Sequence, residues 1–191
     1  MTVTHTNRKG KIYCLHQGMT KKGNPKYFFA LRDEGDLVDI IPPGYEIHES
    51  PNAQVFLRRK RDPIITDEEV ATVETGMQQY CRLERFIIDV KKNAIIIYTP
   101  DQDVDLLVDT LDSLRQPGGR SAKAVVEKLL TYSPMLQFVL VDKEQRLFET
   151  QRYSFLGSID DWMTIDYEDK LPKLVKTYVQ HLGQDSFYEL Y

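Results

Sequence analysis

The spacing of the hydrophobic residues changes once along the chain, close to residue 62. Before that point, short apolar segments alternate with turn-forming residues, and no helical spacing is present. After it, segments with apolar residues three and four positions apart alternate with segments of period two. These periods are typical of helices and strands, so the sequence predicts an α+β protein. We expect a small antiparallel β-rich N-terminal module at residues 1–62 and a larger α+β body at residues 63–191.

The N-terminal module is predicted to be a meander of short strands. Glycine, proline, asparagine and aspartate, which favour turns, break the apolar segments at regular intervals. The strands are expected at residues 12–16, 26–31, 45–48 and 53–57. A module of this size buries little apolar surface alone, so we expect it to lean on the body or on a partner.

The body is predicted to begin with a helix. Thr66 and Glu69 have the spacing of a capping box, in which each side chain accepts a hydrogen bond from the other residue's backbone N–H. Apolar residues then follow at helical spacing, namely Val70, Val73, Met77, Tyr80 and Cys81. The sequence therefore predicts a helix of about four turns.

Two β-hairpins are predicted in the body, at residues 85–99 and 135–155. Residues 95–98 are apolar on both faces, which is typical of a strand inside a sheet. A turn at residues 157–161 is expected to lead into a short further strand at residues 162–167. Together these segments predict a mostly antiparallel sheet of four or five strands with helices packed on one face.

Three further helices complete the predicted body. Two lie between the hairpins, and their expected buried positions are Val104, Leu107, Val108, Leu111 and Leu114 in the first and Ala122, Val125, Val126, Leu129 and Leu130 in the second. The last helix has apolar residues between Leu171 and Leu182, and Gly183 is expected just beyond its end. Phe187 and Leu190 are expected to tuck inward after it.

The charge is distributed unevenly over the chain. The 191 residues carry a net charge of −4, but residues 1–65 hold eleven basic and seven acidic residues, so the excess of acidic residues lies in the body. An asymmetry of this kind indicates charged partners. The N-terminus lacks the apolar run of a secretory signal, no segment is apolar enough to span a membrane, and two isolated cysteines indicate reduced thiols. We therefore expect a cytoplasmic protein without a membrane partner.

Basic and aromatic residues gather at two places in the N-terminal module. Interleaved cations and rings suit single-stranded nucleic acid, because phosphates pair with cations and bases stack on rings. The predicted nucleic-acid-binding residues are Lys21, Lys22, Lys26, Tyr27, Arg58, Arg59, Lys60 and Arg61. Two alternatives remain at this point: the aromatic residues form ordinary core, and the cations at residues 58–61 pair with the acidic body.

Catalytic and metal-binding motifs are weak. Asp105, Asp109 and Asp112 share one helical face, and Asp160 and Asp161 lie in the turn beside Ser158 and Trp162. Such carboxylates suit a hydrolase or transferase only if they converge in a cleft; otherwise they are a solvated surface. No catalytic residue and no cofactor is predicted.

Two segments carry side chains that bind metals or anions in other proteins. Cys14, His16 and His48 supply three of the four protein ligands that structural zinc takes, so no metal site is predicted, and His16 is expected at a sheet surface. Residues 118–123 resemble an anion-binding loop only in composition. The sequence thus favours a non-catalytic binding protein that contacts nucleic acid or another polyanion. A protein–protein interaction module and a carboxylate-dependent hydrolase or transferase are the alternatives.

Overall fold

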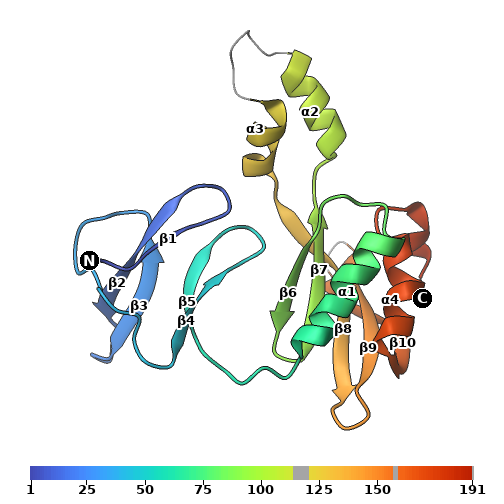
Figure 1. Cartoon of the computed structure of the whole chain (residues 1–191), viewed down its shortest axis with the longest axis horizontal. Coiled ribbons are helices and arrows are strands. Elements are labelled where there is room, and N and C mark those ends of the chain that lie inside the picture. The colour runs from blue at the N-terminus through green and yellow to red at the C-terminus, as the bar shows by residue number, and fades with distance from the viewer. Residues whose placement is uncertain (114–120, 157–158, 191) are drawn as a thin grey trace. The chain divides into compact units, whose positions relative to one another are not determined.

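The computed structural model describes residues 1–113, 121–156 and 159–190, and the chain groups into two compact units. Unit 1 consists of Met1–Asp62 and Gln102–Thr131, and unit 2 consists of Pro63–Asp101 and Tyr132–Tyr191. Each unit is described by itself below (Figure 1). The predicted domain division at residue 62 stays a prediction.

Unit 1 contains two small antiparallel sheets (Figure 1). The first has the order β1-β2-β3, and the second pairs β4 with β5. The strands are β1 (Thr4–Thr6), β2 (Ile12–Met19), β3 (Pro25–Ala30), β4 (Tyr45–Glu49) and β5 (Val55–Arg59). The four strands expected in this region are present, and β1 was not predicted.

The core of the β-strands in unit 1 is small. Leu15 of β2 and Val55 of β5 are buried apolar side chains, and the buried amide of Asn7 donates a hydrogen bond to the carbonyl of Ala53 at 2.6 Å. The carbonyl group of that amide accepts the backbone N–H of Lys11 at 2.8 Å. Because polar groups of this kind are costly to bury without partners, these two bonds fix the β1–β2 turn against the turn before β5.

The helices of unit 1 are α2 (Val104–Ser113) and α3 (Ala122–Leu129). The predicted stripe of α2 is the less exposed side of the helix, which contacts α3, but it is not fully buried: Val104, Leu107, Val108 and Leu111 are half-buried, and the other described positions of α2 are exposed. In α3 the prediction is partly wrong, since Val126 and Leu130 are buried but Leu129 is 60% exposed. Leu114 lies outside the described residues.

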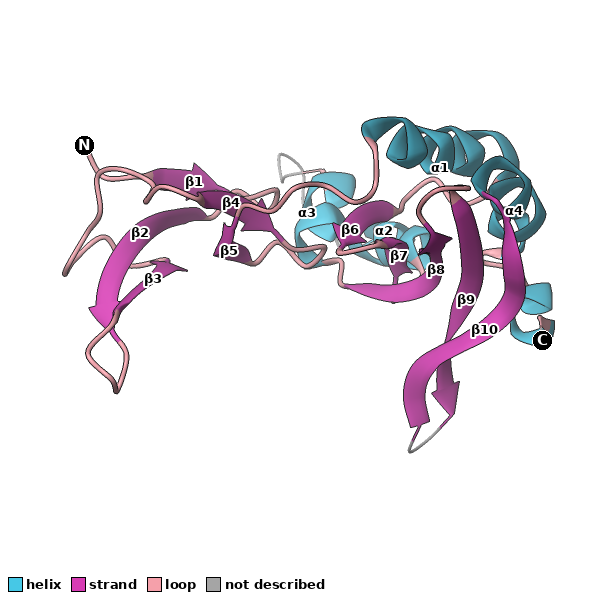
Figure 2. Cartoon of the chain, turned by 90° about the horizontal axis from the view of Figure 1, so that it is seen from below, coloured by secondary structure: helices cyan, strands magenta, loops and turns pink. Residues whose placement is uncertain are grey.

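Unit 2 is built on a five-stranded antiparallel sheet with the order β10-β9-β8-β7-β6. Its strands are β6 (Ile87–Lys91), β7 (Ala94–Pro100), β8 (Tyr132–Asp142), β9 (Leu147–Leu156) and β10 (Ile159–Lys170). Helices α1 (Asp67–Tyr80) and α4 (Leu171–Tyr178) lie on one side of this sheet (Figure 2). The predicted α+β class, with a mostly antiparallel sheet and helices packed nearby, is confirmed.

One strand is longer than the sequence predicted. β10 has twelve residues and pairs with β9 from Ile159 onward, so Asp160 and Asp161 lie in the strand and not in the expected turn. The prediction missed this extension because two adjacent aspartates favour turns, whereas here the long hairpin with β9 imposes the extended backbone.

The two faces of β7 are buried in different clusters. Ile95 and Ile97 pack with the helices α1 and α4, while Ala94, Ile96 and Tyr98 form a second cluster on the opposite face. The predicted interior strand with two apolar faces is therefore confirmed. Within the described residues, every helix is too short or too polar to cross a bilayer.

Local signals set the ends of both large helices of unit 2. Thr66 and Glu69 form both hydrogen bonds of the capping box, and Glu69 also binds Arg146 from the β8–β9 turn, with the Nε–Oε1 distance at 2.8 Å. After α4, Gly183 takes the left-handed conformation with φ of 75°, and Phe187 is buried. These features match the predicted helix start and helix end.

A glycine in the middle of α1 allows this helix to approach α4 closely. A Cβ atom at Gly76 would lie 2.0 Å from Cγ1 of Val175. We expect Gly76→Ala to destabilise unit 2 by about 1–3 kcal/mol, because the clash outweighs the gain of about 1 kcal/mol in helix propensity. Urea unfolding followed by Trp162 fluorescence measures this change.

Thr75→Ala, at the exposed neighbouring position, is the matched control and should leave stability unchanged or slightly raised. The loss of unfolding free energy in the double variant G76A/V175A should be smaller than the sum of the losses in the two single variants. The reason is that alanine at residue 175 lacks the Cγ1 atom that clashes with a Cβ atom at residue 76. Stabilisation by Gly76→Ala alone would show that the two helices do not approach at this point.

Candidate nucleic-acid interface

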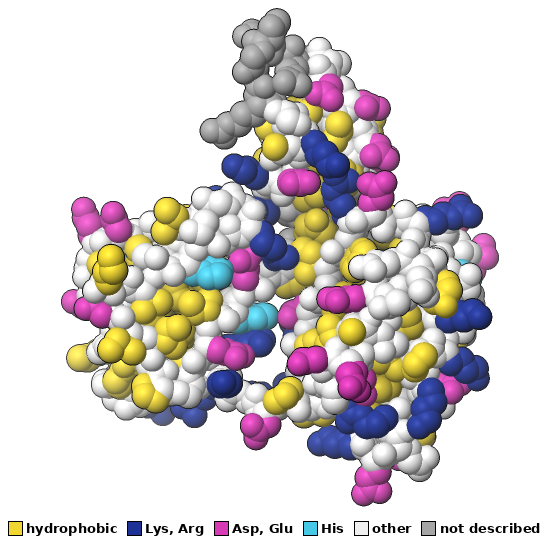
Figure 3. All heavy atoms as spheres, in the orientation of Figure 1, with side chains coloured by type: hydrophobic (Ala, Val, Ile, Leu, Met, Phe, Trp, Pro, Cys, Tyr) yellow, Lys and Arg dark blue, Asp and Glu magenta, His cyan; other side chains and the backbone are white. Residues whose placement is uncertain are grey.

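All eight residues predicted to bind nucleic acid lie in the β-strand part of unit 1. Lys21 and Lys22 lie in the β2–β3 turn, Lys26 and Tyr27 on β3, and Arg58 to Arg61 at the end of β5 and just beyond it. The seven basic side chains are exposed. Figure 3 shows hydrophobic side chains at the centre of the visible face of these sheets and positively charged side chains at its lower margin.

A contact between two tyrosines brings the two basic segments together. The rings of Tyr27 on β3 and Tyr45 on β4 meet edge to face, with centroids 6.1 Å apart. Tyr45 is paired with Arg59 across the β4–β5 hairpin, and Cζ of Arg59 lies 5.9 Å from the centroid of the Tyr45 ring. The start of β3 and the end of β5 therefore lie side by side, although they are far apart in the sequence.

The aromatic residues of β3 are all partly covered. Tyr27 and Phe29 share the face that Leu15 occupies on β2, while Phe28 lies on the other face and stacks on His16 with ring centroids 5.4 Å apart. None of the three rings is fully exposed. Base stacking on Tyr27 stays a prediction, and it requires the part of the ring that Tyr45 leaves uncovered.

Arg58 differs from the other cations of the site. Its Nε atom lies 2.7 Å from Oε1 of Glu46, the residue directly opposite it in the hairpin. Glu46 therefore balances the charge of Arg58, while Arg59, Lys60 and Arg61 extend beyond this ion pair. Because an exposed ion pair weakens the attraction of each member for a further charge, Arg58 should contribute least to binding an anion.

The carboxylate of Glu49 anchors the β4–β5 hairpin to β1 and to the β1–β2 turn. Glu49 accepts hydrogen bonds from the backbone N–H of Arg8 at 3.0 Å and from its Nε at 2.7 Å, and Nε2 of His5 lies 3.1 Å from it. Arg8 also donates to the carbonyl of Ser50. Partial burial raises the pKa of Glu49, but the bonds from Arg8 and His5 outweigh it, so this pKa lies below its ordinary value.

His16 is not at a sheet surface, as expected from the sequence, but is buried with 1% of its surface exposed. It lies under Phe28, and Nε2 is 3.0 Å from the carbonyl oxygen of Arg32, because the chain after β3 folds back over β2. Cys14 is also buried. Among the described histidine, cysteine, aspartate and glutamate residues, no three are placed to hold a metal ion.

The carboxylates considered for catalysis are spread over two elements. Asp105, Asp109 and Asp112 are exposed on α2, and Asp161 accepts the backbone N–H of Trp162 in β10. Ser158 and the glycines of the segment 118–119, with Arg120, lie outside the described residues. The exposed aspartates of α2 match the solvated surface that was the alternative to a catalytic cleft.

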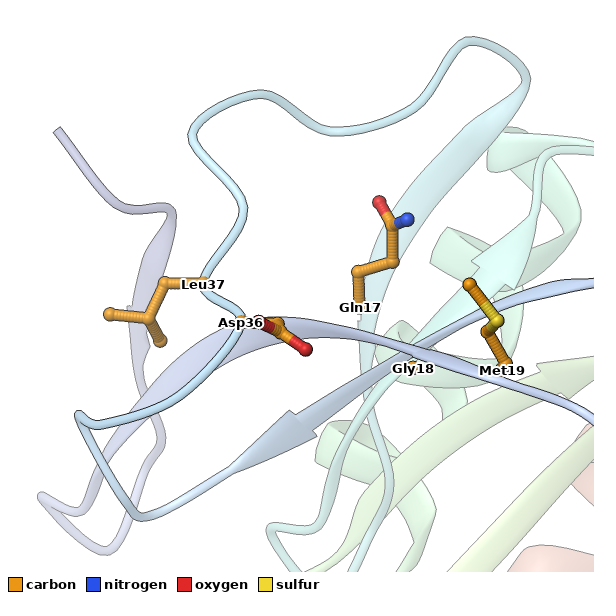
Figure 4. Close-up of a pocket in the computed structure, with 5 residues that line it drawn as sticks. All are labelled: Gln17, Gly18, Met19, Asp36 and Leu37. Carbon is orange, nitrogen blue, oxygen red and sulfur yellow. The ribbon is translucent and has the colours of Figure 1, made fainter.

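A shallow hollow lies on unit 1 beside β2. Gln17, Gly18, Met19, Asp36 and Leu37 line it, and the Leu37 side chain points away from Gln17 and Met19 (Figure 4). The hollow is open, and Asp36 gives it a negative side chain. An anion would be repelled there, so the hollow is not part of the predicted basic site.

Sequence reasoning missed Tyr45 and Glu46. Both lie on a strand that was predicted, but their roles depend on the register of the β4–β5 hairpin. That register pairs Tyr45 with Arg59 and Glu46 with Arg58 across the turn that follows Glu49. A shift of one residue would reverse both faces, and the sequence of the turn does not fix it. Opposite charges at residues 46 and 58 were the available signal.

Comparison of the chain with protein-family models, curated proteins and solved structures finds no match.

The Glu49 anchor predicts a pH dependence of unit 1. Because the folded pKa of Glu49 is lowered, its contribution is complete above the ordinary value of 4.5 and is lost as the pH falls through the lowered value. We expect Glu49→Gln to lower the opening free energy of β4 and β5 by about 1–3 kcal/mol at neutral pH. Hydrogen exchange of the β4 and β5 amides, corrected for its intrinsic pH dependence, measures this.

Glu46→Gln in the same hairpin is the control, because the exposed pair with Arg58 should contribute under about 1 kcal/mol. The difference between wild type and Glu49→Gln should shrink as the pH falls from the ordinary value of 4.5 through the lowered pKa of Glu49. A constant difference at all pH values would contradict the assigned role of the carboxylate.

Proposed function

We propose that unit 1 is a non-catalytic binding module for a polyanion, and that the polyanion is single-stranded nucleic acid. The observation that carries this proposal is the contact of Tyr27, Tyr45 and Arg59, which places the two basic segments at one end of the module. A contiguous row of exposed cations can follow a phosphate backbone, whereas two separate clusters cannot.

The exposed basic side chains of the module that are not balanced by a neighbouring carboxylate also support the binding of a polyanion. Glu46 and Glu49 are the two acidic residues of β4 and β5, and both are paired with cations or hydrogen-bond donors inside the module. Lys21, Lys22 and Lys26 on one side and Lys60 and Arg61 on the other are exposed. The surface beside the tyrosines is therefore positive, although the whole chain is negative.

A protein–protein role for the same module has less support. Among the aromatic side chains of residues 1–62, all of which are described, Phe56 alone is exposed, at 47%. A single exposed ring does not make the exposed aromatic patch that would favour a protein partner at this module.

Cys14 and Cys81 are free thiols, which supports the cytoplasmic location that we propose.

The variant R59A/K60A/R61A tests the proposal. Each lost phosphate contact lowers the slope of log affinity against log salt by about 0.7 for a single strand, so the triple variant should reduce it by about two. Its affinity for a labelled oligonucleotide should fall at least about tenfold at low salt. Fluorescence anisotropy across a salt series measures both quantities.

Two matched variants serve as controls. R58A removes a cation from the same strand and should have a smaller effect, because Glu46 already balances that charge. R82A/K143A/K176A removes three exposed cations from unit 2 and should leave binding and slope unchanged. Equal losses in both triple variants would mean that only net charge matters, and undiminished binding by R59A/K60A/R61A would end the proposal.

A further inference from the structure

Within the described residues of unit 2, one face of the sheet carries no helix of that unit, and this face is called the helix-free face below. The helices α1 and α4 pack on the face of Ile95 and Ile97, and β9 and β10 extend away from these helices on the other side (Figure 2). On that other face, Trp162 packs against the cluster of Ala94, Ile96 and Tyr98. The helix-free face is therefore partly apolar, and its exposed end is formed by β9 and β10.

Three aromatic rings form a cluster at this end. Tyr153 lies edge to face with Trp162, with centroids 5.1 Å apart, and with Phe155 at 4.9 Å. The strand register pairs Trp162 with Tyr153 and Asp160 with Phe155, which places all four side chains on the helix-free face. Phe155 is 51% exposed, which leaves a large apolar side chain in contact with water beside a carboxylate.

The strand that supplies Trp162 is an edge strand with strong negative charge. Within the described strands, β10 pairs with β9 alone, so no described strand pairs with its other edge, which is called the open edge below. Five of its twelve residues are acidic and one is basic, namely Asp160, Asp161, Asp166, Glu168, Asp169 and Lys170. Charges on an open edge prevent pairing with a like-charged strand, and the same charges attract a strand of opposite sign.

The acidic residues of β10 divide into two groups. Asp161 and Asp166 accept backbone N–H groups, Asp166 also accepts the hydroxyl of Tyr178, and Asp169 pairs with Lys173. Asp160 and Glu168 are exposed and take part in none of the side-chain hydrogen bonds or ion pairs of the described residues. These two carboxylates are thus available to a cation from outside.

The same face already holds one cation against a ring. Nζ of Lys91 lies 5.4 Å from the centroid of the Tyr98 ring and 2.7 Å from its hydroxyl oxygen. Among the described cations, none lies over Tyr153, Phe155 or Trp162. Tryptophan is the side chain that attracts cations most strongly through its ring, and a neighbouring carboxylate adds to the attraction.

We propose that β10 and the cluster of Tyr153, Phe155 and Trp162 bind an extended, lysine- or arginine-containing segment of a protein partner, which adds to the sheet as a strand beside β10. Backbone hydrogen bonds to the open edge hold the segment. Its alternate side chains reach the aromatic cluster and Asp160, and the others reach the opposite face. A second copy of β10 is excluded as the occupant, because like charges would face each other along the added strand.

Trp162 is the one tryptophan of the chain, so its fluorescence reports on this site in the full-length protein. The probe is an acetylated peptide of alternating lysine and threonine. We expect a saturable change in Trp162 fluorescence, with an affinity that falls as salt is added. The β10 amides that face the open edge should exchange more slowly with solvent when the peptide is bound.

Two control peptides separate strand addition from simple charge attraction. A peptide with glutamate in place of lysine should not bind. A peptide with the same residues and an N-methyl group on every backbone nitrogen keeps the positive charge but has no backbone N–H donors, and it should bind at least about tenfold more weakly. Equal affinity for the unmodified and N-methylated lysine–threonine peptides, with unchanged amide exchange, would overturn the proposed strand.

The variant D160N/E168Q removes the two available carboxylates and should weaken the lysine peptide about fivefold or more. D105N/D109N removes two exposed carboxylates from α2 and should have no effect. Thermal melting checks that each variant folds as the wild type does; if D160N/E168Q melts early, E168Q alone is compared with D105N. Equal loss in the β10 and α2 variants would place the peptide elsewhere on the acidic surface and overturn the assignment.

Discussion

The burial of both faces of β7 is the constraint on which the rest of unit 2 depends. Ile95 and Ile97 need a hydrophobic cover, and the amphipathic helices α1 and α4 provide it. Ala94, Ile96 and Tyr98 need a hydrophobic cover on the other face, where no described helix of unit 2 packs. Another strand of the same sheet provides part of this cover, because Trp162 from β10 packs on that cluster. The β9–β10 hairpin thus brings Trp162 to the second apolar face of an interior strand.

Unit 1 differs from unit 2, because its strands bury too few apolar side chains to be held together by a hydrophobic core alone. Its strands bury few large side chains, and a small domain of this kind gains little from the hydrophobic effect. Polar bonds of fixed geometry take over part of the role: the amide of Asn7 and the carboxylate of Glu49 each join segments that are far apart in the sequence. Such bonds specify one arrangement, because each is costly to leave unmade once buried.

Local signals made part of this fold predictable. The capping box of Thr66 and Glu69 and the glycine after α4 act within a few residues, so the sequence alone locates both helix ends. The two apolar faces of β7 are equally visible. Strand register is not local, and it decides that Tyr45 meets Arg59 and that Asp160 lies beside Phe155. The burial of His16 and the exposure of Leu129 likewise depend on which segment packs over each of them.

The basic residues of the proposed interface were therefore identifiable by composition, but their convergence was not. Two basic segments of one sequence are consistent with one surface or with two, and the tyrosine contact that joins them depends on the pairing of β4 with β5. The acidic edge of β10 was hidden for a similar reason, because its aspartates resemble a turn until the partner strand is known.

The two proposed surfaces have opposite signs, and this has a consequence for function. Proteins that accompany nucleic acids are often rich in lysine and arginine, because phosphates attract these side chains. A chain with a cationic surface in unit 1 and an anionic strand edge in unit 2 has complementary charge for both members of such a complex. Salt would weaken both contacts together, so salt dependence alone does not tell them apart. Removing charges in one unit at a time does separate the two contacts. Substitutions at the end of β5 should weaken only nucleic-acid binding, and substitutions on β10 should weaken only peptide binding.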